Sequence, residues 1–261
     1  PMGMENGSPI AKDINRIKYF FDRGIRYMTL THAADNQICD SSYDSRNTWN
    51  GLSDFGRKVV REMNKIGMMI DVSHCTDKKF YDILEITNKP LVATHSSPRK
   101  FTPNFERNMS DNMIKDLASN NGLIMLNFGS GFISEQSNKS FGDINSKVEK
   151  YKIENNLKDS DKKILKYKDD LINTVKPFAS INDFVDTIDH VKELVGVVHI
   201  GLGSDFDGLG HTLPYDLKDA STYPNILYKL LEREYSQIEI KKICSDNLFR
   251  VWNANLQNRQ I

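Results

Sequence analysis

The sequence holds 261 residues, of which 35 are lysine or arginine and 35 are aspartate or glutamate. A chain of this length is ordinary for a single α/β barrel domain, and its balanced charge gives no field that selects nucleic acid, so we expect no nucleic-acid partner. The three cysteines share no CxxC spacing, which argues against a thiolate metal site. No apolar run reaches the roughly 18 residues of a membrane span, so no transmembrane segment is expected. The sequence leaves the compartment open.

Short apolar runs alternate with amphipathic stretches from the start of the chain, which is typical of parallel βα units. Ser8, followed by proline, predicts the start of a helix whose apolar residues recur at helical spacing up to Gly24. Ser53, Thr76 and Ser110 are good N-cap residues and predict three more helices. A strand is predicted before each of these helices.

The alternation stops between about residues 134 and 180, where Lys, Asp, Asn and Ser dominate and apolar residues are sparse. This stretch is too long for a bare loop in a compact domain. We interpret it as a solvated insertion with its own helix, which either lies over the site or is a spacer of no functional consequence. A helix, a strand and two further helical patterns follow, so we expect one domain over residues 1–261.

Six strands are predicted, with the sequences MGME, RYMTLTH, MMIDVSH, LVATH, LIMLNF and HIGLGSD. Each carries a polar residue at its carboxyl end: Glu5, His32, His74, His95, Asn127 and Asp205. In parallel α/β folds the carboxyl ends of the strands lie at one edge, and in a TIM barrel they share one mouth. The pattern therefore predicts an α/β fold of the TIM-barrel type with a single shared site.

Three histidines and two carboxylates at strand ends are the donors that Zn²⁺ prefers. A histidine taken alone is more often a hydrogen-bonded structural residue than a ligand, but three at successive strand ends favour a metal. A bound metal lowers the pKa of its water and polarises a carbonyl group. Hydrolysis of an amide-like bond is the natural hypothesis.

Asp205 lies in GLGSDFDG, which lacks the helix start and the third glycine of a dinucleotide loop. We favour Asp205 as the functional residue and Asp207 as a turn or supporting residue. Arg107 follows His95 in a βα loop, where its guanidinium could hold a substrate carboxylate, although spacing alone favours a surface arginine. The remaining histidines are predicted to pack or to face solvent: His190, His199 and His211.

Taken together, these motifs resemble the membrane (renal) dipeptidase family, the M19 peptidases of the amidohydrolase-like barrels. The similar stretches follow the family's order and cover nearly the whole chain: GMENG, RYMTLTH, GLSDFGRKVVREMNKIGMMIDVSH, PLVATHSSPRK, ERNMSD, GLIMLNF, HIGLGSDFDG and DNLFRVW. The resemblance implies a (β/α)8 barrel and a zinc-dependent dipeptidase. A homodimer is the assembly that it suggests.

The resemblance also implies a metal centre. It implies that Glu5 bridges two zinc ions and that His74 and His95 complete the second zinc site. The family's first zinc site also uses a His-x-Asp motif on an earlier strand, and no residue precedes Pro1 in this sequence to supply it. We therefore expect an N-terminally shortened member that holds the last six of eight strands. Asn6 replaces a glycine of the family's turn and is expected to preserve it, because asparagine tolerates left-handed backbone.

The resemblance assigns the substrate contacts as well. It implies that His32 contacts the substrate and the tetrahedral intermediate, that Arg107 binds the terminal carboxylate and that Asp205 handles the proton transfers. Dipeptides, including those with a C-terminal D-residue, would be cleaved by attack of a metal-bridging hydroxide. Two alternatives remain: a truncated, non-catalytic relative that binds zinc or peptide, and another amidohydrolase such as a lactonase or deaminase.

Overall fold

A single parallel sheet forms the centre of the molecule. The computed structural model describes residues 1–257 and 259. Its six strands pair in chain order. They are β1 (Met2–Glu5), β2 (Ile25–Thr29), β3 (Met69–Asp71), β4 (Val92–Ser96), β5 (Leu123–Leu126) and β6 (Ile200–Leu202). Within the described residues β1 and β6 do not pair with each other, so the sheet is open. The predicted α/β fold with six parallel strands is confirmed.

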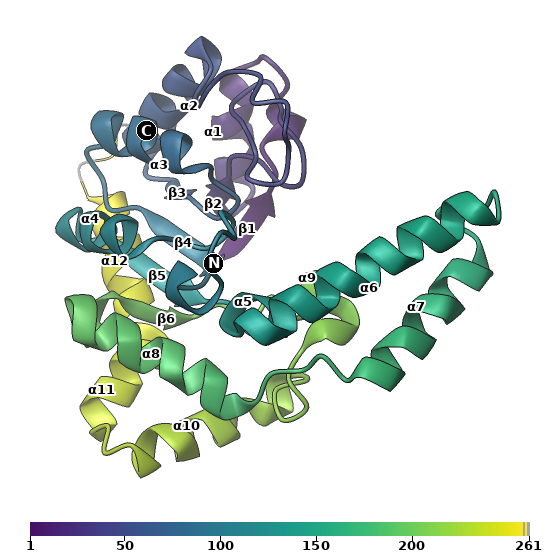
Figure 1. Ribbon diagram of the computed structural model, residues 1–261. Coiled ribbons are helices and arrows are strands. Elements are labelled where there is room, and N and C mark those ends of the chain that lie inside the picture. The colour runs from purple at the N-terminus through teal and green to yellow at the C-terminus, as the bar shows by residue number, and fades with distance from the viewer. Residues whose placement is uncertain (258, 260–261) are drawn as a thin grey trace.

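Helices follow the strands and cover the outer face of the sheet (Figure 1). Those of the first half are α1 (Asn15–Asp22), α2 (Asp54–Ile66), α3 (Asp77–Ile86), α4 (Asp111–Ser119), α5 (Ser130–Ile133) and α6 (Glu135–Glu154). Those of the second half are α7 (Lys162–Val175), α8 (Ile181–Val195), α9 (Phe206–Leu209), α10 (Tyr223–Glu232), α11 (Gln237–Lys241) and α12 (Asn247–Leu256). Helices α1, α2, α4 and α8 pack against β2, β3, β5 and β6, respectively.

The predicted N-caps explain where three helices begin. Ser53, Thr76 and Ser110 each accept a hydrogen bond from a backbone N–H of the first turn, which satisfies a group with no partner inside the helix. The prediction at Ser8 is wrong, since this residue lies in a short 3₁₀ turn and α1 begins later. The positive φ of 50° at Ala11 ends that turn and prevents a continuous helix.

The amino ends of the central strands are closed by α12. Val251 packs against Met69, Val92 and Leu123, which are the first residues of β3, β4 and β5. A π-helical segment, Lys242–Asp246, joins α11 to α12. Apolar side chains thus fill this end of the sheet, whereas the polar side chains of the predicted site lie toward the opposite end, where the strands have their carboxyl termini.

The inner face of the sheet lines a cavity of about 470 Å³. Its walls are apolar near the middle of the strands and become polar toward their carboxyl ends. The apolar walls include Met69, Val92, Met125, Leu202 and Leu248, and the polar rim includes Glu5, His95 and Asp205. The inner face of the sheet therefore leads directly to the predicted site.

The stretch that we interpret as an insertion contains two helices, α6 and α7. They form an antiparallel pair that projects away from the sheet (Figure 1). Tyr151 and Tyr167 stack between them with ring centroids 4.2 Å apart, and Ile144 and Ile164 are buried. Within residues 1–257 and 259, no helix has both the length and the apolar character to cross a membrane.

Gly203 follows β6 at a point where three strands approach closely. Its N–H donates to the carbonyl of Leu126, and a Cβ at this position would lie 2.2 Å from the carbonyl oxygen of Thr94. The main chain can approach the neighbouring strands this closely only because residue 203 has no side chain. This contact sets the path of the chain just before Asp205.

Gly203→Ala is therefore expected to lower the free energy of unfolding by about 1–3 kcal/mol, because the added methyl group must displace backbone. Urea unfolding monitored by circular dichroism measures the change. Gly142→Ala is the matched control: this residue is exposed within α6, and a methyl group added there would meet nothing within 4 Å. Alanine there is expected to stabilise the protein by up to about 1 kcal/mol. A stabilising effect of both substitutions would contradict the close approach at Gly203.

Candidate metal and active site

The side chains of the predicted site come from both strands and loops. Glu5 ends β1 and His95 lies on β4, as predicted. The other predicted strands end before their polar residues, so that part of the prediction is wrong: His32, His74, Asn127 and Asp205 lie beyond β2, β3, β5 and β6. Positive φ angles of 63° at His74 and 56° at Asp205 turn the loop backbone there. The loops nevertheless return the side chains to the carboxyl edge of the sheet.

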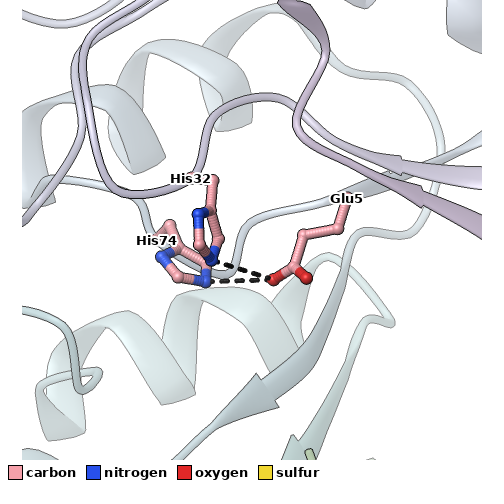
Figure 2. Close-up of side chains that lie close together, drawn as sticks. All are labelled: Glu5, His32 and His74. Carbon is pink, nitrogen blue, oxygen red and sulfur yellow. Dashed lines mark ion pairs between the residues drawn. The ribbon is translucent and has the colours of Figure 1, made fainter. Parts of the chain in front are cut away.

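One carboxylate oxygen lies close to all three imidazoles. Oε1 of Glu5 lies 3.1 Å from Nε2 of His95, 3.2 Å from Nε2 of His74 and 3.7 Å from Nε2 of His32. The Nε2 atoms of His74 and His95 are 3.0 Å apart. Figure 2 shows the Glu5 carboxylate directed toward the rings of His32 and His74. The donors of several separate elements therefore meet at one point.

The three imidazoles differ in their exposure. The side chains of His74 and His95 are 6% and 11% exposed, whereas those of Glu5 and His32 are 46% and 47% exposed. Ligand atoms of Glu5, His32 and His74 lie within 4.8 Å of one another and could hold a metal ion. His32, which the sequence predicts as a substrate contact, thus lies on the open side of the same cluster. The assignment of Glu5, His74 and His95 as ligands stays a prediction.

The electrostatics of the cluster favour the protonation states that bind a cation. The close contacts of its carboxylate with the imidazoles of His74 and His95 hold the pKa of Glu5 far below its ordinary value, against the opposing effect of burial. Burial lowers the pKa of His74 to about 3, although its hydrogen bond to Glu5 acts in the opposite direction. Glu5 is therefore an anion and His74 a neutral imidazole at physiological pH, and these are the forms that coordinate metals.

Asp205 lies on the other side of the mouth, where Asn127 holds its carboxylate. Nδ2 of Asn127 donates to Oδ2 of Asp205 at 2.9 Å, and Oδ1 of Asn127 accepts from the N–H of Gly129 at 2.7 Å. Burial raises the pKa of Asp205, although His95, Asn127 and Arg107 favour its ionised form. A carboxyl group with a raised pKa is suited to exchanging protons. The sequence predicts a polar residue at 127, but not this contact.

Arg107 is a buried cation, only 3% exposed, so the surface position that spacing alone favours is wrong. Nη1 donates to Oγ of Ser96 and Nη2 to the carbonyl of His95, both at 2.8 Å, while Nε has no hydrogen-bond partner among the described residues. In the described part of the chain no carboxylate forms an ion pair with this guanidinium. Burial lowers the pKa of Arg107. A buried arginine with unused N–H groups is arranged to receive an anion.

The family model described as membrane dipeptidase (peptidase family M19) matches residues 1–260. The chain belongs to the membrane dipeptidase family. An uncharacterized dipeptidase of Schizosaccharomyces pombe is 33% identical over 254 residues, which are 97% of this chain and 52% of that protein. This member of the family thus spans about half the length of the curated relative that it matches.

Solved structures carry the same fold. The probable dipeptidase PvdM from Pseudomonas aeruginosa superposes with a TM-score of 0.83 at 25% identity, covering 98% of this chain and 69% of that one. A metallo peptidase from Rhodobacter sphaeroides, liganded with a phosphinate mimic of the dipeptide L-Ala-D-Ala, gives a TM-score of 0.76 at 23% identity. That match covers 97% of this chain and 62% of the Rhodobacter chain. The open sheet of this membrane dipeptidase family member thus has the strand arrangement of the solved dipeptidases.

Three aromatic residues that the sequence analysis did not identify lie near His74 and Arg107. The ring centroid of Tyr43 lies 5.8 Å from that of His74 and 6.2 Å from that of Phe105. Phe105 in turn lies 5.4 Å from Phe132, above which the Arg107 guanidinium sits at 5.3 Å. Tyr43 and Phe105 lie in loops and Phe132 lies in the short helix α5, so no apolar repeat in the sequence indicates them. Only their closeness in sequence to the polar motifs could have done so.

The other histidines lie outside the cluster. His190 is buried on α8, with Nε2 2.9 Å from Asp111 and Nδ1 3.2 Å from Lys100. Nδ1 of His199 lies 2.9 Å from the carbonyl of Gly122. Both residues thus lie apart from the cluster, as expected of histidines that pack or face solvent. His211 is exposed and lies at a separate cavity lined by α7 and the loop after α9.

The raised pKa of Asp205 predicts a pH-dependent cost in stability. A carboxyl group whose folded pKa is raised favours folding below its unfolded pKa, and this contribution is lost as the pH rises through the folded pKa. Asp205→Asn should therefore stabilise the metal-free protein over wild type at neutral pH, and much less below pH 3.8, the ordinary aspartate value. Urea midpoints of both proteins across this range measure the difference. A difference between the two proteins that does not change with pH would argue against burial of this carboxyl group as the cause.

Proposed function

We propose that this chain carries the zinc-dependent dipeptidase activity of its family and hydrolyses the peptide bond of dipeptides. The observation that supports this most strongly is one carboxylate oxygen, Oε1 of Glu5, within 3.1–3.7 Å of three imidazole nitrogens. The buried guanidinium of Arg107, which forms no ion pair among residues 1–257 and 259, borders the same mouth. Together they supply a metal site and an anion site a short distance apart.

The donor set fits zinc. Two neutral imidazoles and one carboxylate, from His74, His95 and Glu5, are the ligands found in catalytic zinc sites, which also keep a position for water. Their Nε2 and Oε1 atoms lie 3.0–3.2 Å from one another, so small shifts would admit an ion among them. A bound zinc would supply a water of low pKa and a centre that polarises a carbonyl group. The number of ions is part of the proposal, and two are expected from the family.

Three further residues would stabilise the transition state, transfer the proton and bind the substrate. His32 is half exposed on the open side of the cluster, so its imidazole can donate to the oxygen of the scissile carbonyl as negative charge develops there. Asp205, with its raised pKa, can accept a proton from the attacking water and return it to the leaving amine. Arg107 can hold the terminal carboxylate through its free N–H groups and thereby fix the distance to the scissile bond.

A dipeptide is the substrate class that this arrangement suits. An arginine beside the metal site demands a free carboxylate one residue beyond the scissile bond, which restricts the length of the peptide on that side. We extend the proposal to dipeptides with a C-terminal D-residue, supported by the family and by the L-Ala-D-Ala mimic bound to the Rhodobacter protein. A lactone or a nucleobase carries no such carboxylate, so the Arg107 site disfavours lactonase and deaminase activity.

The metal and substrate roles can be separated by two substitutions. His95→Ala is expected to lose zinc and turnover together, because it removes a ligand. His32→Ala is expected to keep its zinc and lose turnover by roughly 100–1,000-fold, because only transition-state stabilisation is removed. Atomic emission after dialysis measures zinc per chain, and hydrolysis of a glycine-containing dipeptide measures turnover.

His211→Ala, at an exposed position that lines a separate cavity, is the matched control and should change neither value. Full metal content in His95→Ala would refute the ligand assignment. Zinc binding by the wild-type chain without any turnover would instead support the non-catalytic alternative, in which the chain only binds zinc or peptide.

Arg107→Lys tests the recognition of the carboxylate. The variant keeps the positive charge but loses the paired N–H geometry, worth about 1.5–3 kcal/mol for a bond to a charged group. We expect kcat/KM for a free dipeptide to fall roughly 10–100-fold, with little change for the corresponding dipeptide amide. Arg99→Lys is the control, because Arg99 is already paired with Asp77. An equal loss on acid and amide would show that Arg107 only supports the fold.

A further inference from the structure

A chain of short hydrogen bonds runs beneath the candidate metal site and ends on His95. Oδ2 of Asp71 accepts from Oγ1 of Thr29 and from Oγ1 of Thr94, each at 2.6 Å. Oγ1 of Thr94 lies 2.8 Å from Nδ1 of His95. The three strands β2, β3 and β4 thus meet at one buried carboxylate, and one of its contacts continues to an imidazole of the cluster.

Asp71 can act only as an acceptor in this arrangement. Besides the two hydroxyl groups, its Oδ1 accepts from the N–H groups of Ser73 and Thr94, both at 2.9 Å. A carboxylate that receives four donors, with no exposed surface, has no free position from which to donate a proton. Each hydroxyl group that touches Oδ2 must therefore direct its own proton toward Asp71.

This constraint fixes the proton on His95. Thr94 has one hydroxyl proton, which it gives to Asp71, so its oxygen can only accept from Nδ1 of the imidazole. The opposite arrangement would leave two acceptors, Oδ2 of Asp71 and Oγ1 of Thr94, only 2.6 Å apart with no proton between them beside a fully buried carboxylate. The Nδ1–H tautomer instead leaves the longer contact without a proton, that of 3.1 Å between Nε2 of His95 and the half-exposed carboxylate of Glu5, which costs less. His95 thus carries its proton on Nδ1 and directs the lone pair of Nε2 toward Glu5.

We propose that Asp71 and Thr94 are positioning residues that hold His95 as the Nδ1–H tautomer and so present its Nε2 to the metal. This rests on the zinc site proposed above. The competing tautomer would place a proton on Nε2, where Oε1 of Glu5 lies 3.1 Å away and could accept it. That hydrogen bond would block the lone pair which a metal needs. The relay from Asp71 through Thr94 opposes it.

Orientation of a ligand imidazole through its second nitrogen is a general requirement of metal sites, and loss of the partner typically costs 10–100-fold in metal affinity. His74 lacks such a partner: within the described part of the chain its Nδ1 is buried without a hydrogen bond. Of these two imidazoles, that of His95 is held by the relay and that of His74 is not. Loss of the relay should therefore change the ring of His95 and leave the ring of His74 as it was.

Thr94→Val is the test, because valine keeps the shape of threonine and removes the hydroxyl group. In the chain stripped of metal by a chelator at pH 8.5, ¹⁵N NMR of the His95 ring should show the proton on Nδ1 in wild type and shifted to Nε2 in the variant. Competition with a zinc-binding dye should show zinc affinity reduced about 10–100-fold. Thr94→Ser, which restores the hydroxyl group, should recover both values.

Thr29→Val is the matched control, since it removes a hydroxyl bond of the same length to the same oxygen of Asp71 but makes no contact with His95. It should weaken the fold as Thr94→Val does and leave the tautomer and the zinc affinity unchanged. An unchanged tautomer in Thr94→Val, or an equal loss of affinity in Thr29→Val, would overturn the proposal. The ring measurement needs no zinc, so it remains decisive even where wild type binds none and the proposed function fails.

Discussion

The carboxylate of Glu5 is the contact on which the geometry of the site depends. Its Oε1 is the only atom that approaches all three imidazoles, within 3.7 Å, among the ion pairs of the described residues. Three imidazole rings gathered without an anion would lose solvation and gain little in return. The glutamate supplies that anion from β1, an edge strand that is otherwise largely exposed. The site is thus assembled at the margin of the sheet, where a partly solvated carboxylate can exist at low cost.

Beneath this contact, Asp71 joins the strands that carry the imidazoles. Thr29 on β2 and Thr94 on β4 donate to one oxygen of Asp71 on β3, so the registers of three strands meet at a single buried anion. Burial raises the pKa of Asp71, but His95 and the two hydroxyl groups outweigh this effect and the net shift is downward. A carboxylate satisfied by four donors tolerates little displacement, because each lost bond leaves a buried charge uncompensated. The same group therefore contributes to the alignment of the sheet and to the position of a candidate ligand.

Sequence alone could predict which residues meet but not how they are held. Polar residues after successive apolar runs predicted side chains that do lie close together, because parallel strands bring their carboxyl ends to one edge. The strand before His74 ends at Asp71, earlier than its apolar pattern suggests, and the loop backbone then turns with a positive φ of 63° at His74. Such a turn depends on the folded loop and is not visible in the apolar pattern. The burial of Arg107 depends on Phe132 and on the β4 backbone, which are distant in sequence. The contact between Asp71 and Thr94 likewise joins two strands, and no local pattern records it.

The two buried imidazoles are held by different means, and this decides where a proton can move. The ring of His95 is fixed through Nδ1, whereas His74 is fixed through its backbone, whose carbonyl accepts from the N–H of Ser42 and from the buried Nζ of Lys79. Since no described residue bonds to its Nδ1, His74 can carry its proton on Nε2 and donate it toward Glu5 or His95. Such a neutral donor agrees with the low pKa of both Glu5 and His74. Uptake of a cation by this cluster would then require a proton shift at His74 alone, with His95 and Glu5 already in their binding forms.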